Sequence, residues 1–166
     1  MPLAPEDLKF AVDDARRRHA AVVDLIAASD RQSLGFLQLY VALAGGAFSG
    51  AAAILLPTVG TMPRPLGFGL LGFALPLTVG AVLCMIAVWP SNINLPGRTP
   101  NFWIWALRHE AEEVYLAYLD NLQVKEKQNS DLNRKQGRYM LAAKIAGVAA
   151  PIAGVLVGTA AILANW

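Results

Sequence analysis

Between Leu34 and Trp89 the chain runs for 56 residues with a single charged side chain, Arg64. A water-facing surface needs far more charge, because typical soluble domains are about 25% charged. Over the whole chain, charged residues make up only 16% and hydrophobic residues 55%. These values argue against an ordinary soluble enzyme and against a disordered tail. They predict an all-α integral membrane protein.

Three stretches are long enough to cross a bilayer, which takes about 20 apolar residues in a helix. They are roughly residues 34–56, 66–89 and 145–164. Only the short segment 58–65 joins the first two, so we expect a helical hairpin of two transmembrane helices. The third stretch, rich in Ala and Gly, is expected to form a final transmembrane helix, with a partly buried packing helix as the alternative.

These spans divide the chain into four expected parts: a cytoplasmic amphipathic helix in 1–33, a two-span membrane hairpin in 34–89, a cytoplasmic helical region in 90–144 and a third transmembrane helix in 145–166. Cytoplasmic segments of membrane proteins carry the excess of Lys and Arg. The first and third parts together hold 13 of the 14 basic residues. The N-terminus is therefore predicted to be cytoplasmic and the C-terminus to lie on the other side.

Apolar side chains recur every three or four residues near the N-terminus, at Leu8, Val12, Ala15, His19, Val22 and Ile26. This spacing predicts a helix over residues 5–31 with one buried face. His19 lies on that face, so we expect it to be a core or interface histidine, with a ligand or pH-sensing role as the alternative.

No motif in the chain indicates catalysis or a metal centre. His109 begins the run HEAEE but lacks the second histidine, four residues on, that a zincin requires. The single cysteine, Cys84, lies in an apolar stretch and cannot contribute to a thiolate metal site by itself. The net charge of +2 is too small to indicate a nucleic-acid partner. We therefore expect no catalytic residues, no metal and no cofactor.

Two small-residue motifs lie in the predicted spans. Gly46 and Gly50 form one G-x-x-x-G pair, and Gly154 and Gly158 form another. Small residues allow helix backbones to approach closely in lipid, where packing drives association. These glycines are candidates for helix packing and for a homo-oligomer, although glycine is also common in membrane helices without any such role.

A polar segment, residues 125–139, directly precedes the third span. Its amide and cationic donors include Asn129, Asn133, Lys135, Gln136 and Arg138. Amides can pair with the edge of a base, and Lys or Arg can bind a phosphate. The segment therefore predicts either a site for a small anionic ligand or a basic collar that anchors the third span at anionic membrane lipid.

Three segments in this order resemble the transmembrane effectors of the Pycsar antiphage systems, over about residues 10–160. They are SDRQS at 29–33, YLAYLDNL at 115–122 and NRKQGRY at 133–139. The resemblance implies a multi-pass protein of the bacterial inner membrane. It adds Asp30, Arg31 and Tyr139 to the candidate ligand-binding residues.

The resemblance also implies a function. Effectors of this kind act beside a pyrimidine nucleotide cyclase, which makes cyclic CMP or cyclic UMP on infection. The effector senses the nucleotide and disrupts the membrane, so the infected cell dies before phage mature. Two alternatives remain from the sequence: an accessory subunit of a larger membrane complex, and a holin-like or toxin-like protein that needs no messenger.

Overall fold

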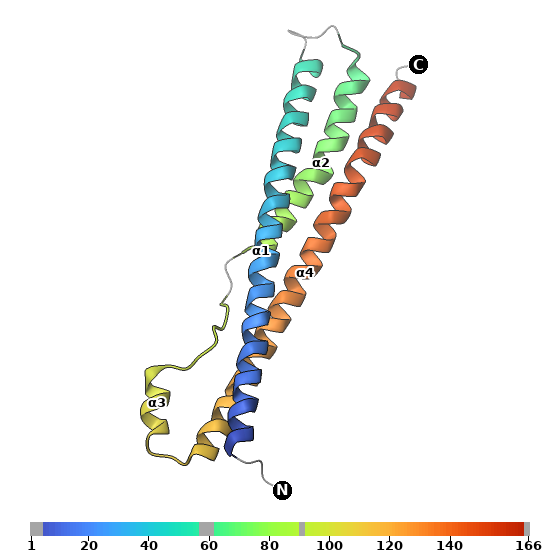
Figure 1. Ribbon diagram of the computed structural model, residues 1–166. Coiled ribbons are helices and arrows are strands. Elements are labelled where there is room, and N and C mark those ends of the chain that lie inside the picture. Colours follow the sequence, from blue (N-terminus) through green and yellow to red (C-terminus); the bar gives the residue numbers. More distant parts are fainter. Residues whose placement is uncertain (1–4, 57–61, 90–91, 165–166) are drawn as a thin grey trace. The chain divides into compact units, whose positions relative to one another are not determined.

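The computed structural model describes residues 5–56, 62–89 and 92–164 of the 166-residue chain. Within these residues the chain forms four α-helices and no strand. The helices are α1 (Pro5–Leu55), α2 (Arg64–Ala87), α3 (Pro100–Ala106) and α4 (Ala111–Ala164) (Figure 1). Three of them, α1, α2 and α4, are long and apolar enough to cross a membrane. An all-helical protein with three candidate spans is thus confirmed. Residues 57–61 of the connection between the first two spans lie outside the described residues.

The helices are more continuous than the sequence predicted. A helix over 5–31 and a separate span were expected, whereas α1 continues through both. Gln32 and Ser33 join the two parts, and neither breaks a helix as Pro or Gly would. In the same way α4 runs through the polar segment into the third apolar stretch. The glycine within that segment, Gly137, costs a helix only about 1 kcal/mol relative to alanine.

The helical region expected in 90–144 contains a short helix, α3, that is separate from α4 in the chain. Pro100 occupies its first turn, where the missing N–H of proline is harmless. At the other end, the N–H groups of Arg108 and His109 donate to carbonyls three residues back, at 3.0 and 3.2 Å. This tighter turn ends α3, and α4 then starts with Glu112 and Glu113 in its first turn, where acidic residues favour a helix N-terminus.

The described residues form two compact units. We call residues 5–29 with 92–134 the charged unit, and residues 30–56, 62–89 and 135–164 the apolar unit. The apolar unit contains one acidic side chain, Asp30, against 11 in the charged unit. It also contains all three apolar stretches. The division between the units therefore follows the division of charge along the chain.

In the apolar unit, α2 packs against both α1 and α4 (Figure 1). Its core is made of small and medium-sized side chains: Tyr40, Ala44, Leu77, Ala81, Cys84, Ala87, Met140, Ala143 and Ala150. Tyr40 is the largest of these, and its hydroxyl donates to the carbonyl of Ala143 at 3.1 Å. Its ring lies against Gly80, where any Cβ would come within 2.9 Å of ring atoms. A glycine at that position is therefore what lets the tyrosine reach α4.

Close approach of α2 and α4 depends on further glycines. A Cβ added at Gly154 would lie 3.1 Å from the carbonyl oxygen of Gly69, and one at Gly158 would lie 3.5 Å from the Gly69 Cα. A Cβ at Gly50 would lie 3.1 Å from Leu70, whereas Gly46 has nothing of the described residues within 4 Å of such an atom. Three of the four glycines of the sequence motifs thus lie at contacts between helices of this chain.

In the charged unit, the predicted stripe of α1 faces inward. Leu8, Val12, His19 and Ile26 are all buried. Val12 packs with Tyr118 and Leu122 of α4, and Phe102 of α3 joins this cluster. The apolar core here is small, so polar contacts carry a large share of the packing in this unit.

The close contact at Gly72 generates a test of the packing in the apolar unit. A Cβ there would lie 2.8 Å from Val157 and 2.9 Å from the carbonyl oxygen of Ala153. Gly72→Ala should therefore destabilise the α2–α4 contact, whereas Gly46→Ala should gain helix propensity without a clash. The free energies of unfolding of the two variants in detergent should differ by about 1–3 kcal/mol, the usual cost of overpacking. Equal stability of the two variants would contradict this packing.

Candidate functional site

A buried amide ties the segment that leads into α3 onto α4. We call residues 92–99 the α2–α3 segment. The side chain of Asn129 is fully buried; its Oδ1 accepts the N–H of Asn94 at 3.0 Å, and its Nδ2 donates to the Asn94 carbonyl at 2.8 Å. One amide therefore satisfies both backbone groups of a residue 35 positions away, much as a neighbouring strand would.

His19 of α1 binds the same backbone residue. Its side chain is fully buried, and its Nε2 lies 2.8 Å from the Asn94 carbonyl oxygen. A carbonyl only accepts, so Nε2 carries the ring proton and Nδ1 is left as an acceptor in the neutral ring. No donor among the described residues reaches that Nδ1. His19 thus joins α1 to the α2–α3 segment as a core histidine.

Further polar groups of α4 hold the same segment. The ammonium of Lys125 donates to the carbonyl of Gly97 at 3.2 Å and lies 3.4 Å from that of Leu95. Gln128 accepts a bond from the Asn94 side chain at 2.8 Å. Gly97 has a φ of +115°, a backbone conformation that suits glycine. The segment is therefore attached to α4 mainly through its backbone polar groups.

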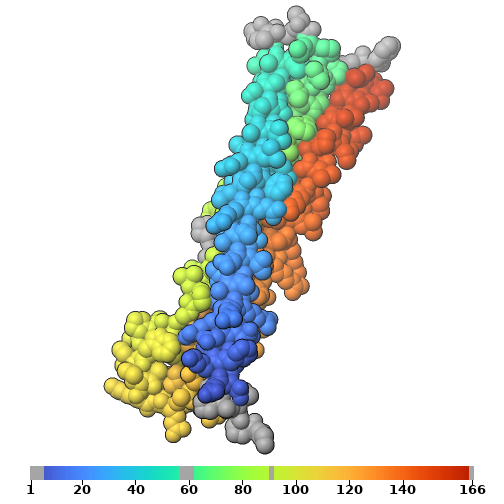
Figure 2. All heavy atoms as spheres, in the orientation of Figure 1, coloured from blue at the N-terminus to red at the C-terminus, as the bar shows by residue number. Residues whose placement is uncertain are grey.

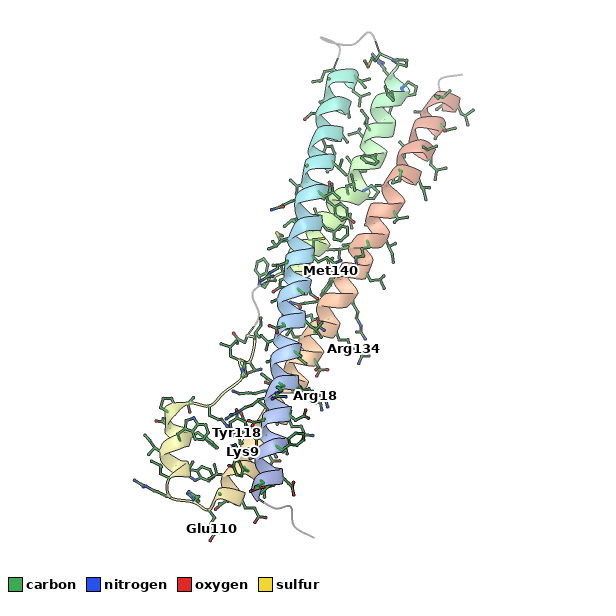
Figure 3. All side chains as sticks on the ribbon, viewed as in Figure 1. Lys9, Arg18, Glu110, Tyr118, Arg134 and Met140 are labelled. Atoms are coloured by element: carbon green, nitrogen blue, oxygen red, sulfur yellow. The ribbon has the colours of Figure 1, made fainter. Side chains whose placement is uncertain are left out.

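An arginine fastens the end of the segment. The guanidinium of Arg98 lies 4.3 Å from the ring centre of Phe102 and donates to the Ala117 carbonyl at 2.5 Å. Beside it, Arg16 of α1 donates through Nε to the hydroxyl of buried Tyr118, which Figure 3 labels, at 2.8 Å. Burial lowers the pKa of Arg98, and the neighbouring Tyr118 partly offsets this effect. The guanidinium groups of Arg16 and Arg98 also lie 4.7 and 5.7 Å from the ring centre of Tyr118, so cation–π contacts join α1 and the α2–α3 segment to α4.

Two of the predicted ligand-binding residues belong to the charged unit. Asn129 is committed to the backbone of Asn94, as described above. Asn133 is half-buried, and its Oδ1 lies 3.5 Å from the hydroxyl of Ser29, a distance at the limit for a hydrogen bond. These two amides thus contact other parts of the same unit.

The other five predicted residues belong to the apolar unit. Arg31, Lys135 and Arg138 are exposed, and none of them forms an ion pair with a described residue. Tyr139 is half-buried and packs against the apolar core. Asp30 is half-buried and accepts a hydrogen bond from Gln136 Nε2 at 3.2 Å. The three cations are arranged as solvated groups that could meet either a phosphate or an anionic lipid.

A groove of about 660 Å³ lies between α2 and α4 in the apolar unit. Its walls are apolar, with Phe73, Pro151 and Ile162 among them and Thr159 as the hydroxyl-bearing residue. Such a lining offers no charge and few donors to a polar ligand. In a bilayer this groove suits the hydrocarbon chains of lipid, because the bilayer core offers no hydrogen bonds to a polar ligand.

The chain matches no protein-family model, and no curated protein or solved structure matches it. Within the described residues, no three His, Cys, Asp or Glu side chains gather as metal ligands would. What the arrangement offers chemically is a set of hydrogen bonds that join helices, together with exposed cations. These features suit binding and conformational coupling.

Sequence reasoning missed three residues on which these contacts depend: Asn94, Arg98 and Tyr40. Asn94 and Arg98 lie in the stretch SNINLPGR, where Asn, Pro and Gly indicate a turn but give no sign of what the turn contacts. Tyr40 was hidden among apolar neighbours within a predicted span. Its hydroxyl could have drawn attention, because a buried tyrosine usually finds a hydrogen-bond partner.

The double hydrogen bond of Asn129 can be tested by substitution. Asn129→Leu keeps the volume but removes both bonds to Asn94, so it should cost about 1–3 kcal/mol of unfolding free energy. Gln128→Ala, which removes only an exposed bond to the Asn94 side chain, is the matched control and should be nearly neutral. Hydrogen exchange at the Asn94 amide should accelerate in the first variant alone. Unchanged exchange in Asn129→Leu would show that the amide does not hold the segment.

Proposed function

We propose that this chain is a non-enzymatic membrane effector of an antiphage abortive-infection system, activated by a cyclic pyrimidine nucleotide that a partner cyclase makes. The observation that carries the proposal is the segregation of charge into two units. The apolar unit, with Asp30 as its one acidic side chain, suits hydrocarbon, and the charged unit suits water. The nucleotide and the defence role come from the resemblance of the segments 29–33, 115–122 and 133–139.

The proposed topology has three spans in the bacterial inner membrane, with α1 and α2 as a hairpin and the charged unit in the cytoplasm. Basic residues support this orientation. Four basic residues lie close in sequence to the start of the first or the third apolar stretch: Arg31, Lys135, Arg138 and Lys144. The connection between the first two stretches carries only Arg64. Excess basic charge marks the cytoplasmic side. It also attracts anionic lipid.

Activation requires a ligand that binds two states of the protein with different affinities. Exposed Lys135, Arg138 and Arg31 supply charge for the single negative charge of a cyclic nucleotide, and Tyr139, which follows Arg138 in the chain, supplies an aromatic ring. We place the phosphate among these cations. The hydrogen bonds around Asn129 and Asp30 are the contacts whose rearrangement would couple binding to the helices.

Association of several copies would produce the membrane lesion. In the apolar stretch of α4, most described side chains are exposed or half-buried within the chain, and Ala150 is a buried exception. Figure 2 shows its orange-to-red surface uncovered on the viewed face. Gly46 contacts no other helix of the described chain, so its small face is open to a second copy. A homo-oligomer formed through these faces is part of the proposal.

The same uncovered face of α4 favours one second candidate, an accessory subunit of a larger membrane complex. In that case the partner would be a different membrane protein, and no nucleotide would be needed. Copurification of a stoichiometric partner, with no response to any cyclic nucleotide, would support this candidate over the effector.

Calorimetry on the purified full-length protein in detergent tests the effector proposal. Cyclic CMP or cyclic UMP should bind more tightly than cyclic AMP. Lys135→Ala and Arg138→Ala should each weaken binding about 10- to 150-fold, because each removes a charge-assisted contact to the phosphate. Lys127→Ala, an exposed cation of the charged unit, is the control and should bind as the wild type does.

In cells that carry the cognate cyclase, the two binding variants should abolish phage-triggered depolarisation at unchanged protein level. A collar that only anchors the third span predicts the opposite pattern, with reduced membrane insertion and no nucleotide effect. Absence of binding by any cyclic nucleotide at millimolar concentration would overturn the effector proposal.

A further inference from the structure

The amide oxygen of Gln136, on α4, has no hydrogen-bond donor among the described residues. The side chain is buried, with 5% of the residue exposed, and its Nε2 donates to Asp30 Oδ1 at 3.2 Å. No donor among the described residues reaches its Oε1. A buried acceptor without a donor destabilises a fold, so such an atom requires an explanation.

The residue that faces this amide can supply the missing donor if it carries a proton. Asp30 is the one acidic side chain of the apolar unit, and it precedes the apolar stretch that begins at Leu34. Burial raises the pKa of Asp30, and the hydrogen bond from Gln136 opposes this effect less strongly. The carboxyl group therefore keeps its proton to a higher pH than an ordinary aspartate does.

The charged groups around Asp30 do not hold it in the ionised form. Arg31 follows it on α1, while Lys135 and Arg138 flank Gln136 on α4, and all three are exposed. Burial and the Gln136 bond are the causes of the shift, with no cation among them. Between Arg64 and Trp89, α2 contributes no charged side chain, and its one thiol, that of Cys84, is itself buried in the core.

We propose that Asp30 and Gln136 form a proton-dependent pair that joins α1 to α4. In this pair the neutral carboxyl group donates its O–H to Gln136 Oε1, and Gln136 Nε2 donates back to the other carboxyl oxygen. A carboxylic acid and a primary amide are complementary in this way, since each has one donor and one acceptor on the facing edge. The proton comes from water and binds reversibly, with no other change in covalent structure.

The pair makes the stability of the apolar unit depend on pH with a definite sign. An unfolded aspartate titrates near about 3.9. Because the pKa of Asp30 is raised in the folded state, the folded protein binds more protons above that value, and its stability falls as the pH rises through the raised pKa. Above this range the ionised carboxylate accepts one bond only, and Gln136 Oε1 loses its donor. This inference is independent of any nucleotide.

Thermal unfolding of the full-length protein in detergent between pH 4 and pH 8, without nucleotide, tests the pair. The melting temperature of the wild type should fall as the pH rises through the raised pKa of Asp30. Asp30→Asn should remove this fall, because the introduced amide donates to Oε1 at every pH. Asp24→Asn, which removes an exposed carboxylate of α1, should leave the fall unchanged.

A second readout uses the wild type alone, so it stands even where the variant does not fold. Infrared spectra of protein with isotope-labelled aspartate resolve the band of the protonated carboxyl group. One of the seven aspartates should lose this band at a higher pH than the other six. Titration of all seven together near pH 4, or a pH-dependent melting temperature that Asp30→Asn leaves intact, would overturn the proposal.

Discussion

Hydrocarbon offers no hydrogen bonds, so every backbone polar group of the apolar unit must be satisfied within the chain. Helices meet this requirement internally, which accounts for the helical form of α2 and of those parts of α1 and α4 that belong to the apolar unit. Because lipid chains are as apolar as the helix surfaces, burying those surfaces gives no hydrophobic gain, and the helices must associate through close packing. The glycines of α2 and α4 allow it: Gly69 approaches Gly154 and Gly158 at backbone distance, and Gly80 leaves room for Tyr40.

The charged unit is held by different forces. Its apolar core is a small cluster around Val12, Tyr118 and Leu122. Asn129 and His19 therefore act through hydrogen bonds to a backbone segment, and Arg98 acts through its stack on Phe102. Contacts of this kind are individually modest in water. A unit held in this way depends on a few specific polar contacts, each of which can be removed by a single substitution.

Much of the fold could be predicted from the sequence because hydropathy is local. The three apolar stretches and the buried stripe from Leu8 to Ile26 need only the chain itself and a helical period. The continuity of α1 could not be predicted, because a helix that passes from water into hydrocarbon changes composition without any breaking residue. The two G-x-x-x-G motifs also look alike in sequence, yet Gly154 lies against α2, whereas a Cβ at Gly46 would meet no atom of the described residues within 4 Å. The face of a helix that contacts a neighbouring helix is decided by tertiary packing, which a short sequence motif does not predict.

The candidate site was predictable only as a list of suitable side chains. Asn129 was expected to bind a ligand, whereas in the structure its side chain forms hydrogen bonds with the backbone of Asn94, 35 residues earlier. Gln136 was expected only as one of these donors, whereas the structure places it against Asp30 and gives its Oε1 no donor among the described residues. Long-range pairing of this kind has no signature in a single sequence.

In the proposed topology, three apolar stretches cross the bilayer and place the two ends of the chain on opposite sides. Paired reporters fused after residue 166 measure this directly: a phosphatase that is active only outside the cytoplasm, and a fluorescent protein that folds only inside it. The proposed topology predicts an active phosphatase and a dark fluorescent protein at the C-terminus, with the reverse at the N-terminus. A fluorescent C-terminal fusion without phosphatase activity would contradict it, because the third stretch would then not cross the membrane.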